Sequence, residues 1–395
     1  MSIATNRLFA ERINDVRPSF IREILKVTND SNIISFAGGL PSERLFPMEQ
    51  LKHASQVAFE NKGAQLLQYS NTEGDIELRQ WIAERYQRQN LSISPDDILI
   101  TNGSQQALDL LGKIFINKGD SIVIENPGYL GALQAFRLYQ AKFLTVSVND
   151  EGMDIKQLQQ TLLANKPKLI YTVPNFQNPT GISYSETNRL AVAQEVIKND
   201  SYLIQDDPYG ELRFSGKEKS NFMSLLPEQT ILLGSFSKII APAFRLGWVV
   251  APKPVMKKLI IAKQAADLHS NSFSQAILSQ YLQDNNLDEH LDKLSKHYGQ
   301  QKIAMETAIK KHFPQATNIT NPEGGLFLWC RLDKGISTRK LFKAAIKKKV
   351  VFVPDESFYT DNIEKNTMRL NYSCADLQVI EAGIKQLSMV IKNTY

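Results

Sequence analysis

The 395-residue sequence is poor in cysteine, with only Cys330 and Cys374. Two cysteines are too few for a disulfide framework or a cysteine-ligated metal site, so we expect no bound metal. The same scarcity suits a reducing compartment, and we expect a cytoplasmic protein. Cys330 lies in the apolar run 326–330, where a buried, reduced thiol is the default.

The sequence also lacks long apolar runs and blocks of like charge. No stretch approaches the roughly 20 apolar residues that span a bilayer, and residues 1–12 lack the apolar core of a signal peptide. The net charge of +5, from 46 basic and 41 acidic residues, is spread along the chain. The densest basic stretch, residues 347–349, reads as a solvated helix end. We therefore expect binding to neither membranes nor nucleic acids.

Short apolar runs alternating with helical periodicity dominate the first three quarters of the chain. Helical patterns cover residues 104–115 and 185–198 among others. Continuous apolar strands between helices are typical of a mostly parallel sheet covered on both faces. The sequence therefore predicts an α/β fold with a seven-stranded, mostly parallel sheet. Its strands are expected at residues 98–101, 121–125, 142–148, 168–173, 202–205, 230–234 and 246–251.

The pattern changes after about residue 290. A long helical stretch around residues 297–313 leads to apolar segments at 325–332, 350–354 and 367–372, with helices between them. This pattern predicts a smaller α+β domain. We expect residues 48–290 to form the large domain, residues 291–395 the small one, and the loop-rich segment 1–47 to pack with the small domain and against the large one.

Polar loops follow five of the predicted strands. They are residues 102–105, 126–129, 174–181, 206–209 and 235–238. Ligands of parallel sheets bind at the carboxyl ends of the strands, where such loops gather. One loop would mean little, because Gly, Asn and Pro end strands anyway. Five in succession, each with different chemistry, favour a site.

Together these loops hold the groups that pyridoxal 5′-phosphate (PLP) requires. The cofactor needs a lysine for a Schiff base with its aldehyde, an acid for its ring nitrogen, donors for its phenolic oxygen and a phosphate site. Lys238, directly after an apolar strand, is the candidate amine, because burial near other cations lowers an amine's pKa. Taken alone, Lys238 reads more simply as a surface lysine that begins a helix.

The ring of the cofactor also has candidate partners. Asp206 suits the ring nitrogen, Tyr209 and Asn178 suit the phenolic oxygen, and Tyr129 suits stacking on the ring. Lys238, Asp206 and Tyr209 are thus the candidate catalytic residues. Taken alone, Asp206 fits a solvated strand end equally well, Asn178 fits a turn in Asn-Pro-Thr-Gly, and Tyr129 fits a core aromatic.

Two segments suit a phosphate group. Ser235, Ser237 and Arg245 offer two hydroxyls and a guanidinium to a dianion. Ser104 and Gln105 open a helix directly after a strand, where backbone N–H groups and the helix dipole favour an anion. By itself, the Gly-Ser-Gln string is equally a plain helix N-cap.

The combination of motifs resembles the fold-type I PLP-dependent aminotransferases of class I and II. The motifs are Asn178-Pro-Thr-Gly, Asp206-x-x-Tyr209 and Ser235-x-Ser-Lys238 with Arg245 seven residues on. Within that family the chain is similar to the branch of 2-aminoadipate and kynurenine aminotransferases. The resemblance runs from about residue 17 to the C-terminus. Supporting strings are Pro18-Ser-x-Ile-Arg22, Ser35-Phe-Ala-Gly-Gly-Leu-Pro41, Leu67-Gln-Tyr69-Ser and Met368-Arg369-Leu-Asn-Tyr-Ser373.

The resemblance implies roles for further residues. Arg369 matches the arginine that grips the substrate's α-carboxylate in a bidentate pair, a geometry that guanidinium suits better than ammonium. Tyr69 matches a tyrosine that reaches the cofactor phosphate of the neighbouring subunit, which implies a homodimer with shared sites. The other implied substrate contacts are with Gly39, Arg22, Asn178 and Tyr129.

The function implied is transfer of the amino group of an L-amino acid to a 2-oxo acid. The amino acid would be of the 2-aminoadipate, aromatic or branched-chain type, and the acceptor 2-oxoglutarate, in a ping-pong reaction through pyridoxamine phosphate. Fold alone does not separate this function from a PLP-dependent lyase or from a non-catalytic regulatory protein.

Two further classes fit poorly. Related bacterial regulators carry a DNA-binding module before this domain, and motifs that begin near residue 17 leave no room for one here. A Rossmann dehydrogenase is disfavoured because no Gly-x-Gly-x-x-Gly follows any strand.

Overall fold

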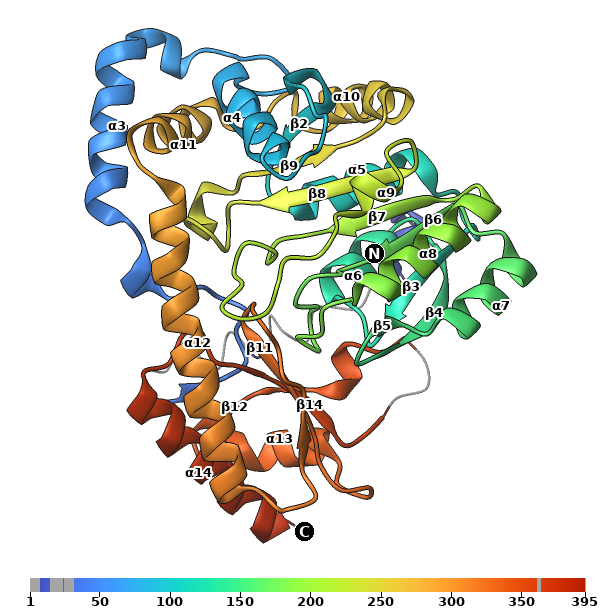
Figure 1. Cartoon of the computed structure of the whole chain (residues 1–395), viewed down its shortest axis with the longest axis vertical. Coiled ribbons are helices and arrows are strands. Elements are labelled where there is room, and N and C mark those ends of the chain that lie inside the picture. Colours follow the sequence, from blue (N-terminus) through green and yellow to red (C-terminus); the bar gives the residue numbers. More distant parts are fainter. Residues whose placement is uncertain (1–7, 15–23, 25–31, 361–363, 395) are drawn as a thin grey trace, which may run out of the picture.

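The computed structural model describes residues 8–14, 24, 32–360 and 364–394. All seven predicted strands of the large sheet form (Figure 1). An eighth, β5 (Gly152–Met153), was not predicted, because two residues are too few to produce a periodic pattern. The predicted strands are β2 (Ile98–Thr101), β3 (Ser121–Asn126), β4 (Lys142–Asn149), β6 (Leu169–Thr172), β7 (Tyr202–Asp206), β8 (Thr230–Ser235) and β9 (Gly247–Val250).

The large sheet has the strand order β2-β9-β8-β7-β6-β3-β4-β5. The five strands from β8 to β4 run parallel to one another, whereas β9 is antiparallel to both of its neighbours and β5 is antiparallel to β4. The mostly parallel sheet of the prediction is therefore confirmed. Because β3, β6, β7 and β8 point the same way, the loops after them emerge at one edge of the sheet.

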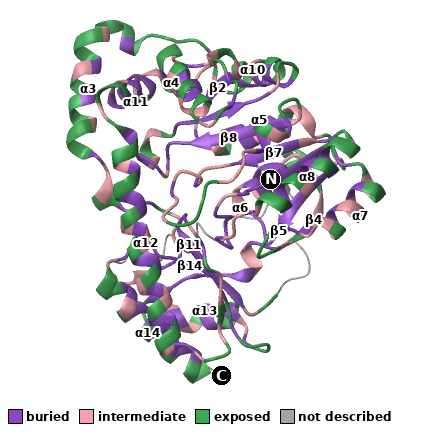
Figure 2. Cartoon of the chain, in the orientation of Figure 1, coloured by how far each residue is buried: buried purple, intermediate pink, exposed green. Residues whose placement is uncertain are grey.

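Alternate residues of each central strand face opposite sides of this sheet. Val123, Ile170 and Leu203 belong to a core cluster with α7 (Ile155–Asn165), α8 (Glu186–Asn199) and α9 (Phe222–Leu225). Their neighbours Ile122 and Ile204 belong to the other core cluster, which includes α5 (Ser104–Phe115) and α6 (Leu130–Arg137). Both faces are thus covered by helices, as the continuous apolar runs require, and the central strands β6, β7 and β8 are almost entirely buried (Figure 2).

The remaining helices of this part surround the β2–β9 side of the sheet (Figure 1). Side-chain caps define where several helices begin. Asp75, Asp154, Ser185 and Asn271 accept hydrogen bonds from the first turns of α4, α7, α8 and α11. The four helices on the β2–β9 side of the sheet are α3 (Met48–Lys62), α4 (Ile76–Gln87), α10 (Lys253–Asp267) and α11 (Ser272–Asp284).

A second, smaller sheet of order β10-β11-β14-β13 is antiparallel throughout. Its strands are β10 (Asn318–Ile319), β11 (Phe327–Arg331), β13 (Val353–Pro354) and β14 (Thr367–Asn371), and helices α13 (Thr338–Lys347) and α14 (Leu377–Thr394) lie beside it (Figure 1). Arg369 is in the central strand β14, paired with Trp329 on one side and Val353 on the other.

Two connections join the parts. Helix α12 (Leu287–His312) runs unbroken from the large sheet down to the small one (Figure 1), so the predicted domain limit at residue 290 falls inside a continuous helix and stays a prediction. The segment that follows residue 32 forms the parallel pair β1 (Ile34–Ser35) with β12 (Val350–Val351). Phe36 extends this contact, because Asn371 N donates to Phe36 O at 2.8 Å. A short helix, α1 (Glu11–Asn14), precedes this segment.

The close packing of β8 on β9 gives a first prediction. A Cβ built on Gly234 would lie 2.1 Å from the ring of Trp248, which itself packs against Phe236 at 4.7 Å between centroids. Gly234→Ala should therefore lower the free energy of unfolding by about 1–3 kcal/mol, the usual cost of overpacking a core. Denaturant unfolding measures this, with Gly38→Ala as control, since its Cβ meets Leu40 at 3.4 Å. Equal stability of the two variants would contradict the prediction.

Candidate active site

A cavity of about 310 Å³ opens where the central strands end. We call it the strand-end cavity. Ten of the residues singled out from the sequence line it, which confirms that the loops after the strands meet in one place. They are Ser104, Gln105, Tyr129, Asn178, Asp206, Tyr209, Ser235, Ser237, Lys238 and Arg245.

Lys238 follows β8 directly and reaches the N-terminal segment, because its Nζ donates to Gly39 O at 2.7 Å. Burial lowers the pKa of Lys238 to about 8, and the positive charges of Arg369 and Arg245 act in the same direction, against an opposing effect of Cys374. A substantial fraction of the amine is therefore neutral near pH 8. A neutral amine is the form that acts as a nucleophile and as a base.

Asp206 is the last residue of β7 and is buried. Its Oδ2 accepts a hydrogen bond of 2.7 Å from Tyr171 Oη, whereas its Oδ1 is buried without a hydrogen-bond partner among the described residues. Burial raises the pKa of Asp206 to about 7, and the nearby carboxylates of Asp207 and Glu125 add to this effect, while the Tyr171 hydrogen bond opposes it. The site thus holds a carboxylate with one free acceptor oxygen.

Arg369, from the small sheet, contacts the cavity wall at Asn178, which itself hydrogen-bonds to Tyr209. Arg369 Nη1 donates to Asn178 Oδ1 at 2.8 Å, Arg369 Nη2 donates to Ala37 O at 2.6 Å, and Asn178 Nδ2 donates to Tyr209 Oη at 3.4 Å. The guanidinium lies over the ring of Phe327 at 4.3 Å, and burial lowers the pKa of Arg369 to about 10. No carboxylate of the described chain pairs with it, so this cation is available to an anionic ligand.

The loop that carries Asn178 rests on a buried carboxylate that the sequence did not single out. Glu125, at the end of β3, accepts hydrogen bonds from four donors in and around this loop. The donors are Thr172 Oγ1, Val173 N, Gln177 Nε2 and Tyr184 Oη, at 2.7–2.9 Å. Glu125 therefore fixes the loop to β3, and its signal in the sequence was an acidic residue inside an otherwise apolar run.

The other end of the cavity suits an anion. Ser104 is the first residue of the 12-residue helix α5, so the N-terminal end of its dipole faces the cavity. Gly103 before it has φ +71°, and a Cβ there would lie 2.7 Å from Arg245 Nη2, so a glycine is required. The hydroxyls of Ser235 and Ser237 complete this end. Hydroxyls, guanidinium and helix N-terminus together form a phosphate-binding set.

A buried ionic cluster holds the turn before α5 in place. Lys263, fully buried on α10, pairs with Asp267 at 2.9 Å and donates to Gln106 Oε1 at 3.0 Å. Asp267 also accepts hydrogen bonds from Asn102 and Gln106. Sequence reasoning missed this cluster because its partners are some 160 residues apart in the chain.

Four predicted site residues are not among those that line the cavity: Tyr69, Gly39, Arg369 and Arg22. Tyr69 is 79% exposed, and its ring meets only His269, edge to face at 5.9 Å, among the described aromatic contacts. Arg22 lies outside the described residues. Gly39, predicted to line the substrate pocket, touches the site through its carbonyl, which accepts from Lys238.

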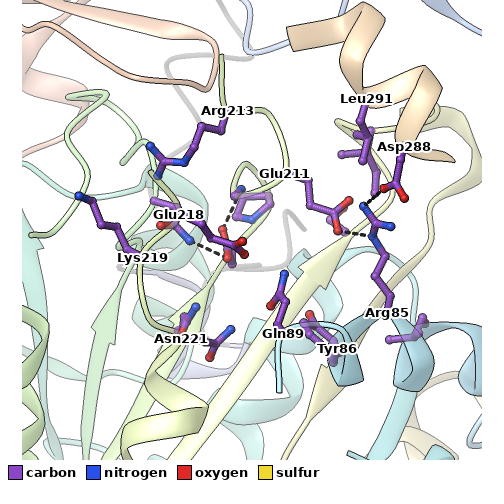
Figure 3. A pocket seen from close by; sticks show the side chains of 18 of the residues that line it. Arg85, Tyr86, Gln89, Glu211, Arg213, Glu218, Lys219, Asn221, Asp288 and Leu291 are labelled. Carbon is purple, nitrogen blue, oxygen red and sulfur yellow. Dashed lines mark hydrogen bonds and ion pairs between the residues drawn. The ribbon is translucent and has the colours of Figure 1, made fainter. Parts of the chain in front are cut away.

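A second cavity, of about 320 Å³, lies between α4, the loop after β7 and the start of α12 (Figure 3). Arg85 on α4 bridges Glu211 Oε1 at 2.5 Å and Asp288 Oδ1 at 2.8 Å, and so ties these three elements together. Pro208 and Ser235 line both cavities. The ion pairs of the second cavity thus support the wall of the strand-end cavity from behind.

The parallel sheet, the lysine after β8 and the acid at the end of β7 define the class of PLP-dependent enzymes of fold type I. The comparisons narrow this further: the profile of aminotransferase class I and II matches residues 31–387. The chain therefore belongs to the class I and II aminotransferase family. Among the described residues no cluster of His, Cys, Asp or Glu is placed to hold a metal ion. None of the described helices is long and apolar enough to cross a membrane.

Similar proteins cover nearly the whole chain. The aromatic-amino-acid aminotransferase 1 of Thermococcus litoralis is 41% identical over 98% of this chain and 94% of its own length. A kynurenine aminotransferase structure from Pyrococcus horikoshii superimposes with a TM-score of 0.94 at 40% identity, covering 99% of this chain and 98% of that one. An α-aminoadipate aminotransferase from Thermus thermophilus has a TM-score of 0.93 at 36% identity, with 99% of both chains covered.

The family uses PLP, and the residues of the strand-end cavity fit this group. The partnerless Oδ1 of Asp206 suits a ring N–H, and no internal donor competes for it in the described chain. The anion-binding end consists of the N-terminus of the 12-residue helix α5, two serines and an arginine, and these groups suit the phosphate. The donor set therefore matches both ends of the cofactor.

The raised pKa of Asp206 gives a second prediction. An unfolded aspartate ionises at about pH 4, so between that value and its folded-state pKa of about 7 the native protein binds the extra proton. Burial of Asp206 thus costs stability progressively as the pH rises through this window, and the cost is constant above it. Asp206→Asn should therefore make the cofactor-free protein more stable at pH 8, with a gain that shrinks toward pH 4.

Thermal unfolding of the cofactor-free variants across this pH range measures the effect. Asp96→Asn serves as the control, because the Asp96 side chain is 93% exposed. A gain from Asp206→Asn that is the same at pH 4 and pH 8 would contradict the argument.

Proposed function

We propose that this chain transfers the amino group of an L-amino acid to a 2-oxo acid, with 2-oxoglutarate as acceptor, in a ping-pong reaction. The observation that carries the proposal is that an amine of lowered pKa and a carboxylate with a free oxygen line one cavity. The guanidinium of Arg369, without a carboxylate partner among the described residues, contacts Asn178 of its wall. A PLP-dependent lyase on the same fold needs the first two groups as well. The products of the reaction, rather than these groups, therefore distinguish the two activities.

The cofactor would be held by residues already described. Ser104, Gln105, Ser235, Ser237 and Arg245 would bind the phosphate, as their place around the α5 N-terminus suggests. Asp206 would accept from the ring nitrogen, Tyr209 and Asn178 would donate to the phenolic oxygen, and Tyr129 would stack on the ring. When bound, the cofactor supplies an electron sink for the bond that breaks at the substrate's α-carbon.

Lys238 would be the residue that moves protons. Its amine is partly neutral near pH 8, so it accepts the α-proton of the amino acid and gives a proton back in the next step. Arg369 would hold the α-carboxylate, with Asn178 beside it to set the orientation. Arg369 loses little in this exchange, because its present partners are neutral oxygens of Ala37 and Asn178.

The amino donor is proposed to be of the 2-aminoadipate, aromatic or branched-chain type. The names of the relatives reported above give aromatic amino acids, kynurenine and α-aminoadipate as their substrates. The apolar rings of Phe327 and Phe358 lie beside Arg369 at 4.3 and 5.2 Å, which supports donors with apolar side chains. Arg22 is proposed to meet a distal carboxylate when the donor carries one.

A homodimer with shared sites is proposed from Tyr69. Tyr69 is 79% exposed and Leu67, two residues before it, is 75% exposed, and neighbouring exposed apolar side chains are typical of an interaction surface. Tyr69 would reach the cofactor phosphate of the partner subunit. The proposed location of the assembly is the cytoplasm.

Half-reactions test the proposed activity. The holoenzyme mixed with an amino acid and no acceptor should release one 2-oxo acid per site and lose the absorbance of the aldehyde form, while Lys238→Ala should do neither. Adding 2-oxoglutarate should restore the absorbance. Ranking donors by kcat/KM then identifies the substrate. Release of ammonia or carbon dioxide in place of an aminated cofactor would instead indicate a lyase.

Subunit mixing tests the shared site. Lys238→Ala and Tyr69→Ala should each be impaired alone, because each lacks one group of every site. A mixed dimer contains one site with both groups intact, so co-refolding the two variants should restore activity above either parent. Mass measurement by light scattering should give twice 44.6 kDa. A monomeric mass, or no gain on mixing, would overturn the shared site.

A further inference from the structure

Tyr171 is a buried tyrosine behind the strand-end cavity rather than in its wall. It lies in β6, where it pairs in register with Ile204 of β7, and it is 1% exposed. Its ring packs edge to face against Phe136 of α6, with centroids 6.0 Å apart. The hydroxyl is therefore held in a fixed position, from which it donates to Asp206 Oδ2 at 2.7 Å.

This hydrogen bond gives the two carboxylate oxygens of Asp206 different environments. Oδ2 is held by Tyr171, and the carboxyl group cannot rotate without breaking that bond. Oδ1 is left buried without a partner in the part of the chain that the structure describes, and Asp206 lines the cavity. The free oxygen is therefore the one presented to a ligand. A buried acceptor without a donor is costly, so the fold maintains it only by fixing the opposite oxygen.

The groups around Asp206 otherwise oppose its ionisation. Glu125 at the end of β3 and Asp207, the residue after β7, carry negative charge toward it, and Tyr129 and Tyr209 lie on the cavity side. Among the described residues Tyr171 is the one side chain that donates a hydrogen bond to it. A donor to a carboxylate stabilises the charged form.

We propose that Tyr171 is a positioning residue that acts through Asp206, holding it ionised and oriented so that Oδ1 meets the ring nitrogen of the bound cofactor. The inference rests on the proposed function, because it needs PLP in the strand-end cavity. It assigns a role to a residue that does not touch the cofactor. The consequence is that cofactor affinity and turnover both depend on one hydroxyl in the layer behind the site.

Tyr171→Phe removes this hydroxyl and keeps the ring. Tyr184→Phe is the matched control, since Tyr184 is also fully buried and also donates to a buried carboxylate, at 2.7 Å to Glu125, but does not contact Asp206. Both variants lose one buried hydrogen bond, so a general structural effect lowers their thermal midpoints similarly. An effect that passes through Asp206 appears in Tyr171→Phe alone.

Cofactor release from diluted holoenzyme, followed by absorbance, is the first readout. Tyr171→Phe should bind PLP about tenfold more weakly at pH 7, because a hydrogen bond to a charged group is worth about one factor of ten or more. Tyr184→Phe should stay within about twofold of the wild type. Without the donor the pKa of Asp206 rises, so the pH midpoint of cofactor affinity should move upward, and the difference should narrow above that midpoint.

Steady-state kinetics give the second readout. Tyr171→Phe should lower kcat about tenfold, because a less ionised Asp206 weakens the electron sink. KM for the amino donor should change by less than about twofold, since Arg369 and Asn178 keep their contacts. If Tyr171→Phe does not fold, site-specific 3-fluorotyrosine at position 171 replaces it. This analogue keeps the shape and donates more strongly, so the pH midpoint should move downward.

The outcomes separate this inference from the proposed function. If Tyr171→Phe matches Tyr184→Phe in cofactor affinity and pH midpoint, the role of Tyr171 is overturned, while wild-type transamination still supports the function. A change in KM alone would equally overturn it, because it would point to the substrate rather than to Asp206. If the wild type neither binds PLP nor transaminates, both proposals fall together.

Discussion

The structure depends on keeping three charged groups, the buried Asp206 and Arg369 and the half-buried Lys238, without ion-pair partners among the described residues. Asp206 and Lys238 line the strand-end cavity, Arg369 hydrogen-bonds to Asn178 of its wall, and no ion pair joins any of the three to another described residue. Burying an unpaired charge is among the most costly arrangements in a protein. The perturbed pKa values of about 7, 8 and 10 express that cost in each group. The remainder of the fold supplies neutral hydrogen-bond partners that reduce this cost.

Each charged group hydrogen-bonds to a neutral group that is distant from it in the sequence. Tyr171 of β6 donates to Asp206, the Gly39 carbonyl accepts from Lys238, and the Ala37 carbonyl accepts from Arg369. The two carbonyls belong to a segment fixed to the small sheet by the β1–β12 pairing. Large sheet, small sheet and N-terminal segment are therefore all required to assemble one site. This explains why the motifs of the site extend over most of the sequence.

The sequence predicts the parts of this arrangement that repeat. Apolar runs give the strands of the large sheet, and the loop after each central strand gives the groups at its carboxyl end, including Asp206 and Lys238. The resemblance adds Arg369, which no local pattern marks. Tyr171 and Glu125 escape prediction because apolar-run analysis treats residues inside strands as packing. Lys263 and Asp267 escape because their partners are distant in sequence. Polar groups that act from behind a site have no periodic signal.

Neutral partners are also what keep the three charges useful. A direct Lys238–Asp206 ion pair would stabilise the empty protein, but it would raise the pKa of the lysine and occupy the oxygen that faces the cavity. Hydrogen bonds to a hydroxyl and to carbonyls orient the groups and leave their charges to be matched by ligands. The family's cofactor and substrate carry the complementary charges: a ring N–H⁺ for Asp206 and a carboxylate for Arg369. Ligand binding therefore pairs the charges that the fold leaves unpaired. The free-energy cost of burying them in the empty protein is recovered as affinity for the ligands.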